Sequence, residues 1–127
     1  MDAEVFRAWI VSAAGVIEAN RDHLTQLDAA GVRQLGAARE GDKTMVDALA
    51  PATRAFSKAI ADGAAPDDTL SVLAEAASAG AAATVSMQAL KGRASYLGPR
   101  SVGHEDPGAA STALILAALR DAARAGR

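Results

Sequence analysis

The sequence predicts an all-α fold, an antiparallel helical bundle or barrel with about four main helices. Two observations lead to this prediction. Of the 127 residues, 34 are alanine, the best helix former, and only 3% are aromatic. No stretch alternates Val, Ile or Thr with polar residues in the way that a half-buried strand does. Apolar residues instead recur every three or four positions, which is the spacing of one face of a helix.

A first helix is expected over residues 3–29, with a continuation to about residue 36. Its apolar positions follow the stripe of an amphipathic helix. Gly31 makes a break within this region equally consistent with the pattern. The stripe consists of Val5, Phe6, Trp9, Ile10, Val16, Ile17, Leu24 and Leu27.

A loop over residues 36–42 is expected to precede a second helix, which runs to about Asp62 with Asp42 as its N-cap. Pro51 lies inside this helix and is expected to kink or split it, because proline lacks the N–H that an internal helical position donates. Gly63 has the properties of a C-terminal stop. The apolar stripe consists of Met45, Val46, Leu49, Ala52, Phe56, Ala59 and Ile60.

A third helix is expected to begin at Pro66, which is followed by two acidic residues, and to end near Leu90. Residues 92–105 form a loop of about fourteen residues, and a loop of that length in a small domain is usually functional. A final helix is expected from Pro107 to about Ala125. Its predicted buried face consists of Leu114, Ile115, Ala118, Leu119 and Ala122.

Composition and charge exclude several classes of function. The formal net charge of −2 and the absence of a basic tract with interleaved aromatics argue against a nucleic-acid-binding protein. Because the chain has no cysteine, disulfides, thiol catalysis and thiolate metal sites are excluded. Neither a basic leader nor an apolar run long enough to span a bilayer is found, so a cytoplasmic protein without membrane contact is expected.

The segment over residues 91–108, KGRASYLGPRSVGHEDPG, is the most informative part of the chain. Asp106 is suited to cap the last helix, and Pro107 suits its first position. The free amides and the positive end of the helix dipole favour an anion there. The cationic side chains ahead of this helix are Lys91, Arg93, Arg100 and His104. Cations converging on a helix start predict a phosphate-bearing ligand.

Three stretches of the chain carry a resemblance to a known family. KGRASYLGPRSVGHEDPGAAS resembles the C-terminal signature of the nucleotide-binding L subunit of dihydroxyacetone kinase. GAAREGDKTMVDAL, over residues 36–49, is similar to the GDKTM loop and the following helix of the same family. VFRAWIVSAAGVIEANRDHLTQLDAA, over residues 5–30, resembles the first helix of that family. Together these stretches cover nearly the whole chain.

The resemblance implies a barrel of antiparallel helices that binds ADP or ATP with Mg²⁺ at one end. It implies phosphoryl transfer to dihydroxyacetone held on a partner K subunit. In the phosphotransferase-coupled form, an M subunit rephosphorylates the bound ADP. The chain begins near the first family helix and ends near the last, so a free-standing L subunit is expected.

The chain departs from the family pattern after Ala30. In the family, LDAA leads into an Ile-Gly-Asp-x-Asp-His-Gly loop, and a Gly-Gly-Ala-Ser-Gly loop follows further on. Here the sequence passes directly to GVRQLGAAREGDKTM, so a contiguous block of several helices is expected to be missing. Residues 1–127 are therefore predicted to form one internally shortened domain. The remaining helices are expected to repack as a four-helix bundle or to pair with a second chain as a homodimer.

The resemblance also implies roles for individual residues. Asp28 matches the first of three aspartates that hold magnesium in the family, and the other two have no counterpart, which leaves an incomplete metal site. The implied nucleotide-contacting residues are Gly36, Met45, Arg93, Asp106, Pro107 and Gly108. Most of them have a plainer alternative. Asp28 could be a solvated helix residue, Met45 a core residue and Arg93 a surface cation. Asp106, Pro107 and Gly108 could serve simple helix capping.

No catalytic residue is predicted. Lys43 is expected to be an exposed lysine, with contact to phosphate as the alternative, and His104 is expected to be a structural loop residue. The serines lack the Gly-x-Ser-x-Gly signature of a nucleophile, and no glycine-rich Walker loop is present. The first hypothesis is therefore a kinase subunit, and the rival hypothesis is a non-catalytic helical interaction module or a remnant without function.

Overall fold

The computed structural model describes residues 37–126, and the regular structure within this range is entirely helical. Three α-helices are present, α3 (Val46–Ala61), α4 (Pro66–Ala83) and α5 (Pro107–Ala125). Two 3₁₀ segments, η1 (Thr84–Ser86) and η2 (Arg93–Ser101), lie between α4 and α5. The predicted all-α class is thus confirmed. The helix predicted over residues 3–36 lies outside the described residues.

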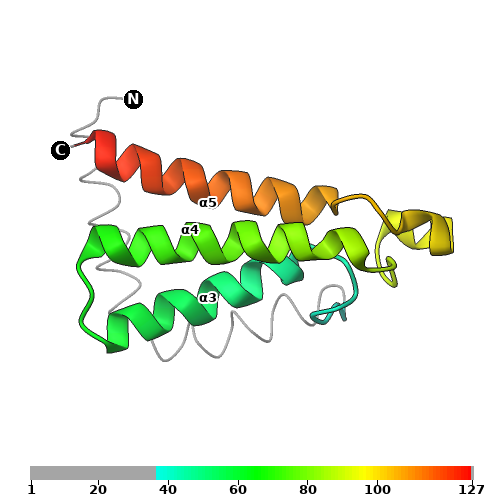
Figure 1. Ribbon diagram of the computed structural model, residues 1–127, viewed down its shortest axis with the longest axis horizontal. Coiled ribbons are helices and arrows are strands. Elements are labelled where there is room, and N and C mark those ends of the chain that lie inside the picture. The colour runs from blue at the N-terminus through cyan, green and yellow to red at the C-terminus, as the bar shows by residue number, and fades with distance from the viewer. Residues whose placement is uncertain (1–36, 127) are drawn as a thin grey trace.

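The three α-helices form an antiparallel arrangement with α4 in the middle (Figure 1). A short turn joins α3 to α4 at one end of the bundle. The loop before α3, the 3₁₀ segments and the start of α5 all lie at the opposite end (Figure 1). Segments distant in the sequence therefore meet at this second end.

The start of α3 differs from the prediction. The helix begins at Val46, and the Asp42 carboxylate accepts a hydrogen bond from the Arg39 amide at 2.8 Å, so Asp42 is not the N-cap. The helix then continues through Pro51 to Ala61, and the predicted division at Pro51 is wrong. Proline leaves the carbonyl one turn earlier without its helical donor. That carbonyl belongs to Asp47 and faces Gly80 of α4.

The end of α3 agrees with the prediction. Gly63 has a positive φ of 73°, which glycine adopts without steric cost. The Gly63 amide donates to the Ile60 carbonyl at 3.1 Å, and the Ala64 amide donates to the Ala59 carbonyl at 2.9 Å. This pair of hydrogen bonds is a Schellman motif, which satisfies the last carbonyls of the helix.

Helix α4 is shorter than predicted. It ends at Ala83, and the chain makes one 3₁₀ turn to Ser86 before Met87 takes an extended conformation. The extended residues then bring the Leu90 amide to the Asp42 carbonyl, 3.0 Å away. The Leu90 amide therefore donates to a distant carbonyl, and not to one in the preceding turn as it would in a longer α4.

Helix α5 has the predicted bounds, from Pro107 to Ala125, but a different buried face. Ala109 is fully buried, and Ala113 packs beside it against Ala48 and Ala81. Leu114 and Ile115, predicted to be buried, are 71% and 67% exposed. The larger side chains point away because the small ones allow α5 to approach α4 closely.

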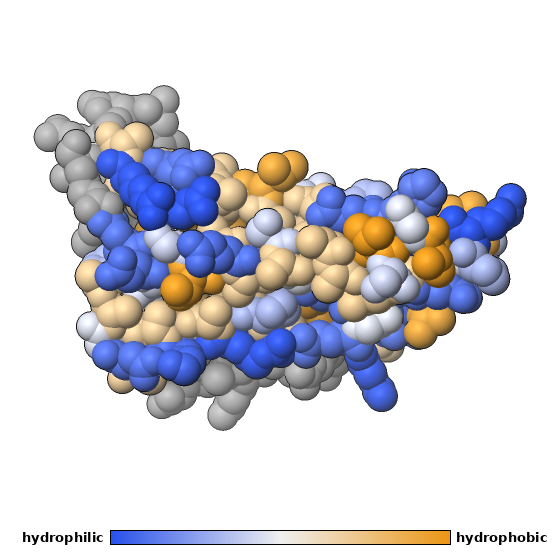
Figure 2. All heavy atoms as spheres, viewed as in Figure 1, coloured by the Kyte–Doolittle hydropathy of each residue, from blue (hydrophilic) through white to orange (hydrophobic). Residues whose placement is uncertain are grey.

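The core of the described residues consists of small side chains. The buried hydrophobic residues are all alanines: Ala38, Ala48, Ala52, Ala74, Ala77, Ala81, Ala89 and Ala109. Each buried methyl group contributes only about 0.8 kcal/mol by leaving water. On the visible face in Figure 2, strongly hydrophobic atoms form separate patches among polar ones. Stability in this part of the chain therefore depends on close helix contact.

Gly80 marks the closest approach between α3 and α4. A Cβ atom at this position would lie 2.2 Å from the Asp47 carbonyl oxygen and 3.1 Å from Cα of Ala48. The first distance is far shorter than a non-bonded contact allows, so only glycine fits without moving the backbone. The glycine thus sets the spacing between the two helices.

Candidate functional site

The predicted site residues divide into two groups. Asp28 and Gly36 lie outside the described residues. Met45, Arg93 and the tripeptide Asp106-Pro107-Gly108 all lie at the end of the bundle that carries the 3₁₀ segments. We call this end the loop platform and define it as residues 39–47, 84–90 and 92–108.

The start of α5 is held by two side chains. The Asp106 carboxylate accepts a hydrogen bond from the Ala109 amide at 2.8 Å, which confirms the predicted N-cap. The Asp106 amide donates to the Thr84 hydroxyl at 2.9 Å, and that hydroxyl donates to the Ala81 carbonyl at 2.6 Å. Thr84 is fully buried and Asp106 is 7% exposed. The end of α4 therefore fixes the start of α5.

The first turn of α5 offers one amide to a ligand. Pro107 has no N–H, while the amides of Ala109 and Ala110 donate to the carboxylate and the carbonyl of Asp106. The Gly108 amide is left without an acceptor among residues 37–126, as expected for a helix N-terminus. A ligand oxygen or nitrogen that approaches this turn thus has a specific donor.

Met45 lies directly beside this turn. A Cβ atom on Gly108 would lie 3.5 Å from the Met45 amide nitrogen and 3.6 Å from the Met45 Cβ. Met45 is 44% exposed, so the alternative in which it is a core residue is wrong. The fold therefore brings two candidate residues from distant parts of the sequence into contact at an accessible position.

The loop before α3 is ordered around the Asp47 carboxylate. Its two oxygens accept hydrogen bonds from the Gly41 amide at 2.6 Å and the Thr44 amide at 2.9 Å. Asp47 is 5% exposed, and the two donors satisfy the buried carboxylate. This carboxylate thereby sets the backbone path that leads to Met45.

Lys43 departs most from the prediction. It is 3% exposed instead of being a surface lysine. Its ammonium donates to the Met87 carbonyl at 3.1 Å and to the Ser101 carbonyl at 2.5 Å. The acceptors are 44 and 58 residues away along the chain. Lys43 therefore links the loop before α3 to the segments that contain Met87 and Ser101.

The loop predicted over residues 92–105 is structured and contains η2. The Ser101 hydroxyl accepts from the Ala89 amide at 2.9 Å and donates to the Gly98 carbonyl at 2.7 Å. The Gly103 amide donates to the Val85 carbonyl at 2.7 Å. Gly98 has φ 55° and kinks η2. These bonds hold the segment against the end of α4.

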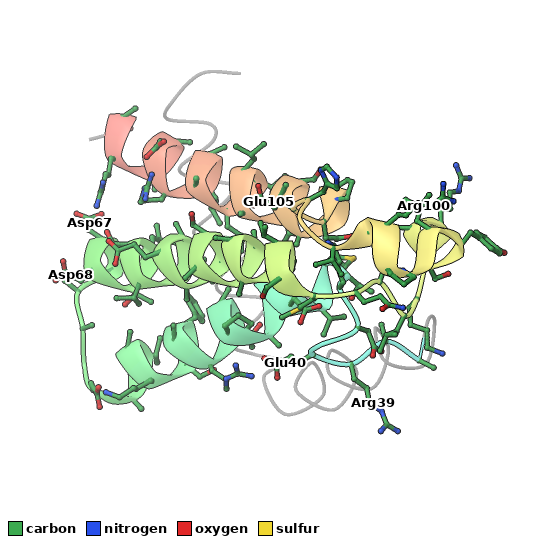
Figure 3. All side chains as sticks on the ribbon, turned by 45° about the vertical axis from the view of Figure 1, so that its right-hand side comes forward. Arg39, Glu40, Asp67, Asp68, Arg100 and Glu105 are labelled. Carbon is green, nitrogen blue, oxygen red and sulfur yellow. The ribbon has the colours of Figure 1, made fainter. Side chains whose placement is uncertain are left out.

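The cationic side chains of this segment do not all converge on α5. Lys91, Arg93, Arg100 and His104 are all exposed. Arg100 extends outward from the tip of η2, away from the bundle (Figure 3). The predicted convergence on the helix start is therefore wrong for Arg100. Arg93 begins η2 on the same end of the bundle as Met45 and Gly108.

The described residues contain no preformed cluster of metal ligands. Within residues 37–126, no group of three or more His, Asp or Glu side chains is arranged to hold a metal. The carboxylates of Asp47 and Asp106, which lie in the platform, already accept hydrogen bonds from backbone amides.

None of the described helices combines the length and the apolarity needed to cross a bilayer.

Sequence reasoning missed the roles of four buried polar residues of the platform, Lys43, Asp47, Thr84 and Ser101. Each bonds to backbone groups of another segment. No local sequence pattern predicts such hydrogen bonds, because only the tertiary fold brings the donors and acceptors together. The GDKT stretch itself was visible as a loop, but the burial of its lysine was not.

Comparison with known proteins supplies a family. The sequence model described as "DAK2 domain" matches residues 6–121. The ADP-binding subunit DhaL of the PEP-dependent dihydroxyacetone kinase of Escherichia coli K12 is 41% identical over 96 residues, which cover 76% of this chain and 46% of the relative.

Two further relatives come from other bacteria. The ADP-binding subunit DhaL of the PEP-dependent dihydroxyacetone kinase 2 of Listeria innocua is 39% identical over 105 residues, which cover 80% of this chain and 48% of the relative. The L-erythrulose 1-kinase of Mycolicibacterium smegmatis is 40% identical over 119 residues, which cover 88% of this chain and 20% of the relative. The chain spans less than half the length of each of these three proteins.

Proposed function

Since the chain belongs to the DAK2 domain family, we propose that it binds ADP or ATP at the loop platform. In this proposal it acts as the nucleotide-binding subunit of a dihydroxyacetone kinase. The relatives named as ADP-binding subunits support the ligand class. Residues 1–127 are proposed to form one internally shortened domain of this type, located in the cytoplasm.

The observation that carries the proposal is the close approach of Met45 to Gly108. Both residues match nucleotide-contacting positions of the family, and they adjoin each other at an accessible surface. Gly108 has no side chain, so Met45 and the Asp106 carboxylate can lie close to the backbone of the helix start. The Met45 thioether is soft and polarizable and packs well against aromatic rings. The Gly108 amide supplies a donor to one ring or ribose acceptor.

The adjacent Asp106 influences which part of the nucleotide lies at this turn. Its buried carboxylate stands beside the helix start and repels a phosphate group at close range. We therefore assign the uncharged adenosine portion to Met45, Pro107 and Gly108. The phosphates are assigned to the side of Arg93, whose exposed guanidinium is suited to bidentate contact with phosphate oxygens.

The proposed reaction is phosphoryl transfer to dihydroxyacetone held on a partner K subunit. The residues of this chain would bind the nucleotide and orient its terminal phosphate toward that partner. Magnesium would neutralise phosphate charge when bound, with Asp28 as the proposed protein ligand. Either ATP itself or ADP rephosphorylated by an M subunit would serve as the donor.

A second candidate function is a non-catalytic helical module that binds a K-like partner or a second copy of itself. The exposed apolar residues of α5 favour it, because Leu114 and Ile115 are 71% and 67% exposed. Co-purification with a K subunit without kinase activity would support this candidate. A monomer by light scattering that fails to bind a K subunit would count against it.

Calorimetric titration with ADP, with and without Mg²⁺, tests the proposed function. We expect saturable binding of one ADP per chain. Arg93→Gln should weaken it about tenfold, because a charge-assisted hydrogen bond is lost. Arg120→Gln, at the far end of α5, is the matched control and should leave the affinity unchanged. Absence of heat for the unaltered protein at millimolar ADP would reject the proposal.

A further inference from the structure

Lys43 combines two features that are costly unless they serve a purpose. Its side chain is 3% exposed, and burying an ammonium group is unfavourable unless its donors are satisfied. Its φ is 63°, in the left-handed region that residues with a Cβ rarely adopt. Strained backbone of this kind clusters at functional sites. Gly41 and Gly92, two other platform positions with positive φ, carry glycine.

The two acceptors of the Lys43 ammonium lie on either side of Arg93. The Met87 carbonyl follows η1, and the Ser101 carbonyl ends η2, whose first residue is Arg93. The ammonium therefore clamps both ends of the segment that carries this arginine. The Ser101 hydroxyl reinforces the clamp, since it accepts from the Ala89 amide at 2.9 Å.

The same lysine belongs to the loop that carries Met45. Between them stands Thr44, whose amide donates to Asp47 at 2.9 Å and whose hydroxyl accepts from the Val46 amide at 3.1 Å. The backbone from Lys43 to the start of α3 is thus fixed. A displacement of Lys43 would move Met45 relative to Gly108, which lies against it.

We propose that Lys43 is a positioning residue for the nucleotide: it couples the loop that carries Met45 to the segment that carries Arg93. It does so through the carbonyl oxygens of Met87 and Ser101, and not by contact with phosphate. The assignment rests on the proposed function, because it presumes that Met45 and Arg93 bind the same ligand. Without the ammonium, no side chain would link the loop that carries Met45 to the segment that carries Arg93 through these two hydrogen bonds.

The chain contains no cysteine, which allows a test by chemical rescue. Lys43→Cys is alkylated in denaturant and refolded, in one portion with 2-bromoethylamine and in another with iodoacetamide. The first reagent restores an amine with one sulfur in place of a methylene group. The second leaves a neutral amide. Lys58→Cys, treated in the same two ways, is the matched control because the Lys58 side chain is 79% exposed.

The affinity for ADP is measured by calorimetry, and circular dichroism records the helix content of each protein. We expect the neutral Lys43 derivative to remain helical and to bind ADP about ten- to a hundredfold more weakly, since two hydrogen bonds from a charged donor are lost. The aminoethyl derivative should recover most of the affinity. Both Lys58 derivatives should bind like the unaltered protein.

Three outcomes would overturn the assignment. Equal affinity of the two Lys43 derivatives would remove the ammonium from any role in binding. Loss of helical structure in the neutral derivative would make Lys43 a determinant of folding alone. Failure of the unaltered protein to bind ADP would reject the proposed function and, with it, this assignment.

Discussion

The body of the helical bundle and its loop platform are held together in different ways. In the body, the buried side chains are alanines, and α3 and α4 touch through Gly80. In the platform, the buried side chains other than Ala89 are polar or charged: Lys43, Asp47, Thr84, Ser101 and Asp106. Among the described residues, the body has one buried polar side chain, that of Thr69.

This difference shows where the chain specifies a unique geometry. Small apolar contacts are non-directional, so they fix the distance between helices but little else. Hydrogen bonds from buried groups have defined partners and penalise any misplacement. The platform is therefore the more sharply defined region, although it contains little α-helix. A binding site needs this definition, and a supporting bundle does not.

The largest expected effect comes from breaking the close contact in the body. Gly80→Leu places a side chain where even a Cβ would lie 2.2 Å from the Asp47 carbonyl oxygen. We expect a loss of about 3 kcal/mol in the free energy of unfolding, since overpacking forces the helices apart. Urea denaturation measures it. Ser78→Leu, at an exposed position of α4, should change the value by about 0.5 kcal/mol or less. Equal effects would show that the contact is not tight.

The second largest loss of stability is expected from removing a buried hydrogen bond in the platform. Thr84→Val keeps the shape of the side chain but leaves the buried Asp106 amide without its acceptor. We expect a loss of about 1–3 kcal/mol, which is the cost of an unsatisfied buried donor. Thr53→Val, whose exposed hydroxyl donates to the Leu49 carbonyl, should cost much less. Thermal unfolding of both variants decides the point, and equal losses would contradict the account.

A smaller effect is expected at the cap of α5. Asp106→Ala removes the acceptor of the Ala109 amide, and loss of an N-cap costs about 1 kcal/mol. Asp106→Asn keeps an acceptor and should recover most of this loss. Denaturation curves for the two variants provide the measurement. If asparagine proved as destabilising as alanine, the charge and not the hydrogen bond would be responsible.

The sequence predicted the helix ends that local residues determine, among them the start of α4 at Pro66. Asp106 and Pro107 define the start of α5, and Gly63 defines the end of α3, because capping uses residues adjacent to the helix. The end of α4 was not predictable, since Leu90 is drawn away by the Asp42 carbonyl. The exposure of Leu114 and Ile115 was missed because an apolar stripe does not show that alanines make the closest contacts.

Part of the candidate site was also predictable. The stretch from Arg93 to Gly108 predicted a structured loop and a capped helix, and both are present. The burial of Lys43 was not predictable, because its acceptors are the carbonyls of Met87 and Ser101. Every residue carries a backbone carbonyl, so the sequence does not show which carbonyls accept hydrogen bonds from Lys43.

The smallest effect is expected at a surface ion pair of the body. A hydrogen bond from Lys58 to Asp62, 2.6 Å long, raises the pKa of Lys58 above its ordinary value of 10.5. Stability from this pair is fully present below that value and is lost as the pH rises through the raised pKa. Because both side chains are exposed, Lys58→Gln should leave thermal unfolding at neutral pH unchanged. A clear loss there would show that surface charge matters more than the alanine core.

We propose that the platform, and not the body, receives an adenine nucleotide. Amide chemical shifts recorded by NMR during a titration with ADP test this proposal. We expect shifts concentrated in residues 41–47 and 92–110, with the Gly108 amide among the largest, and little change over residues 52–78. Shifts centred on the middle of α3 and α4, or none at saturating ADP, would contradict it.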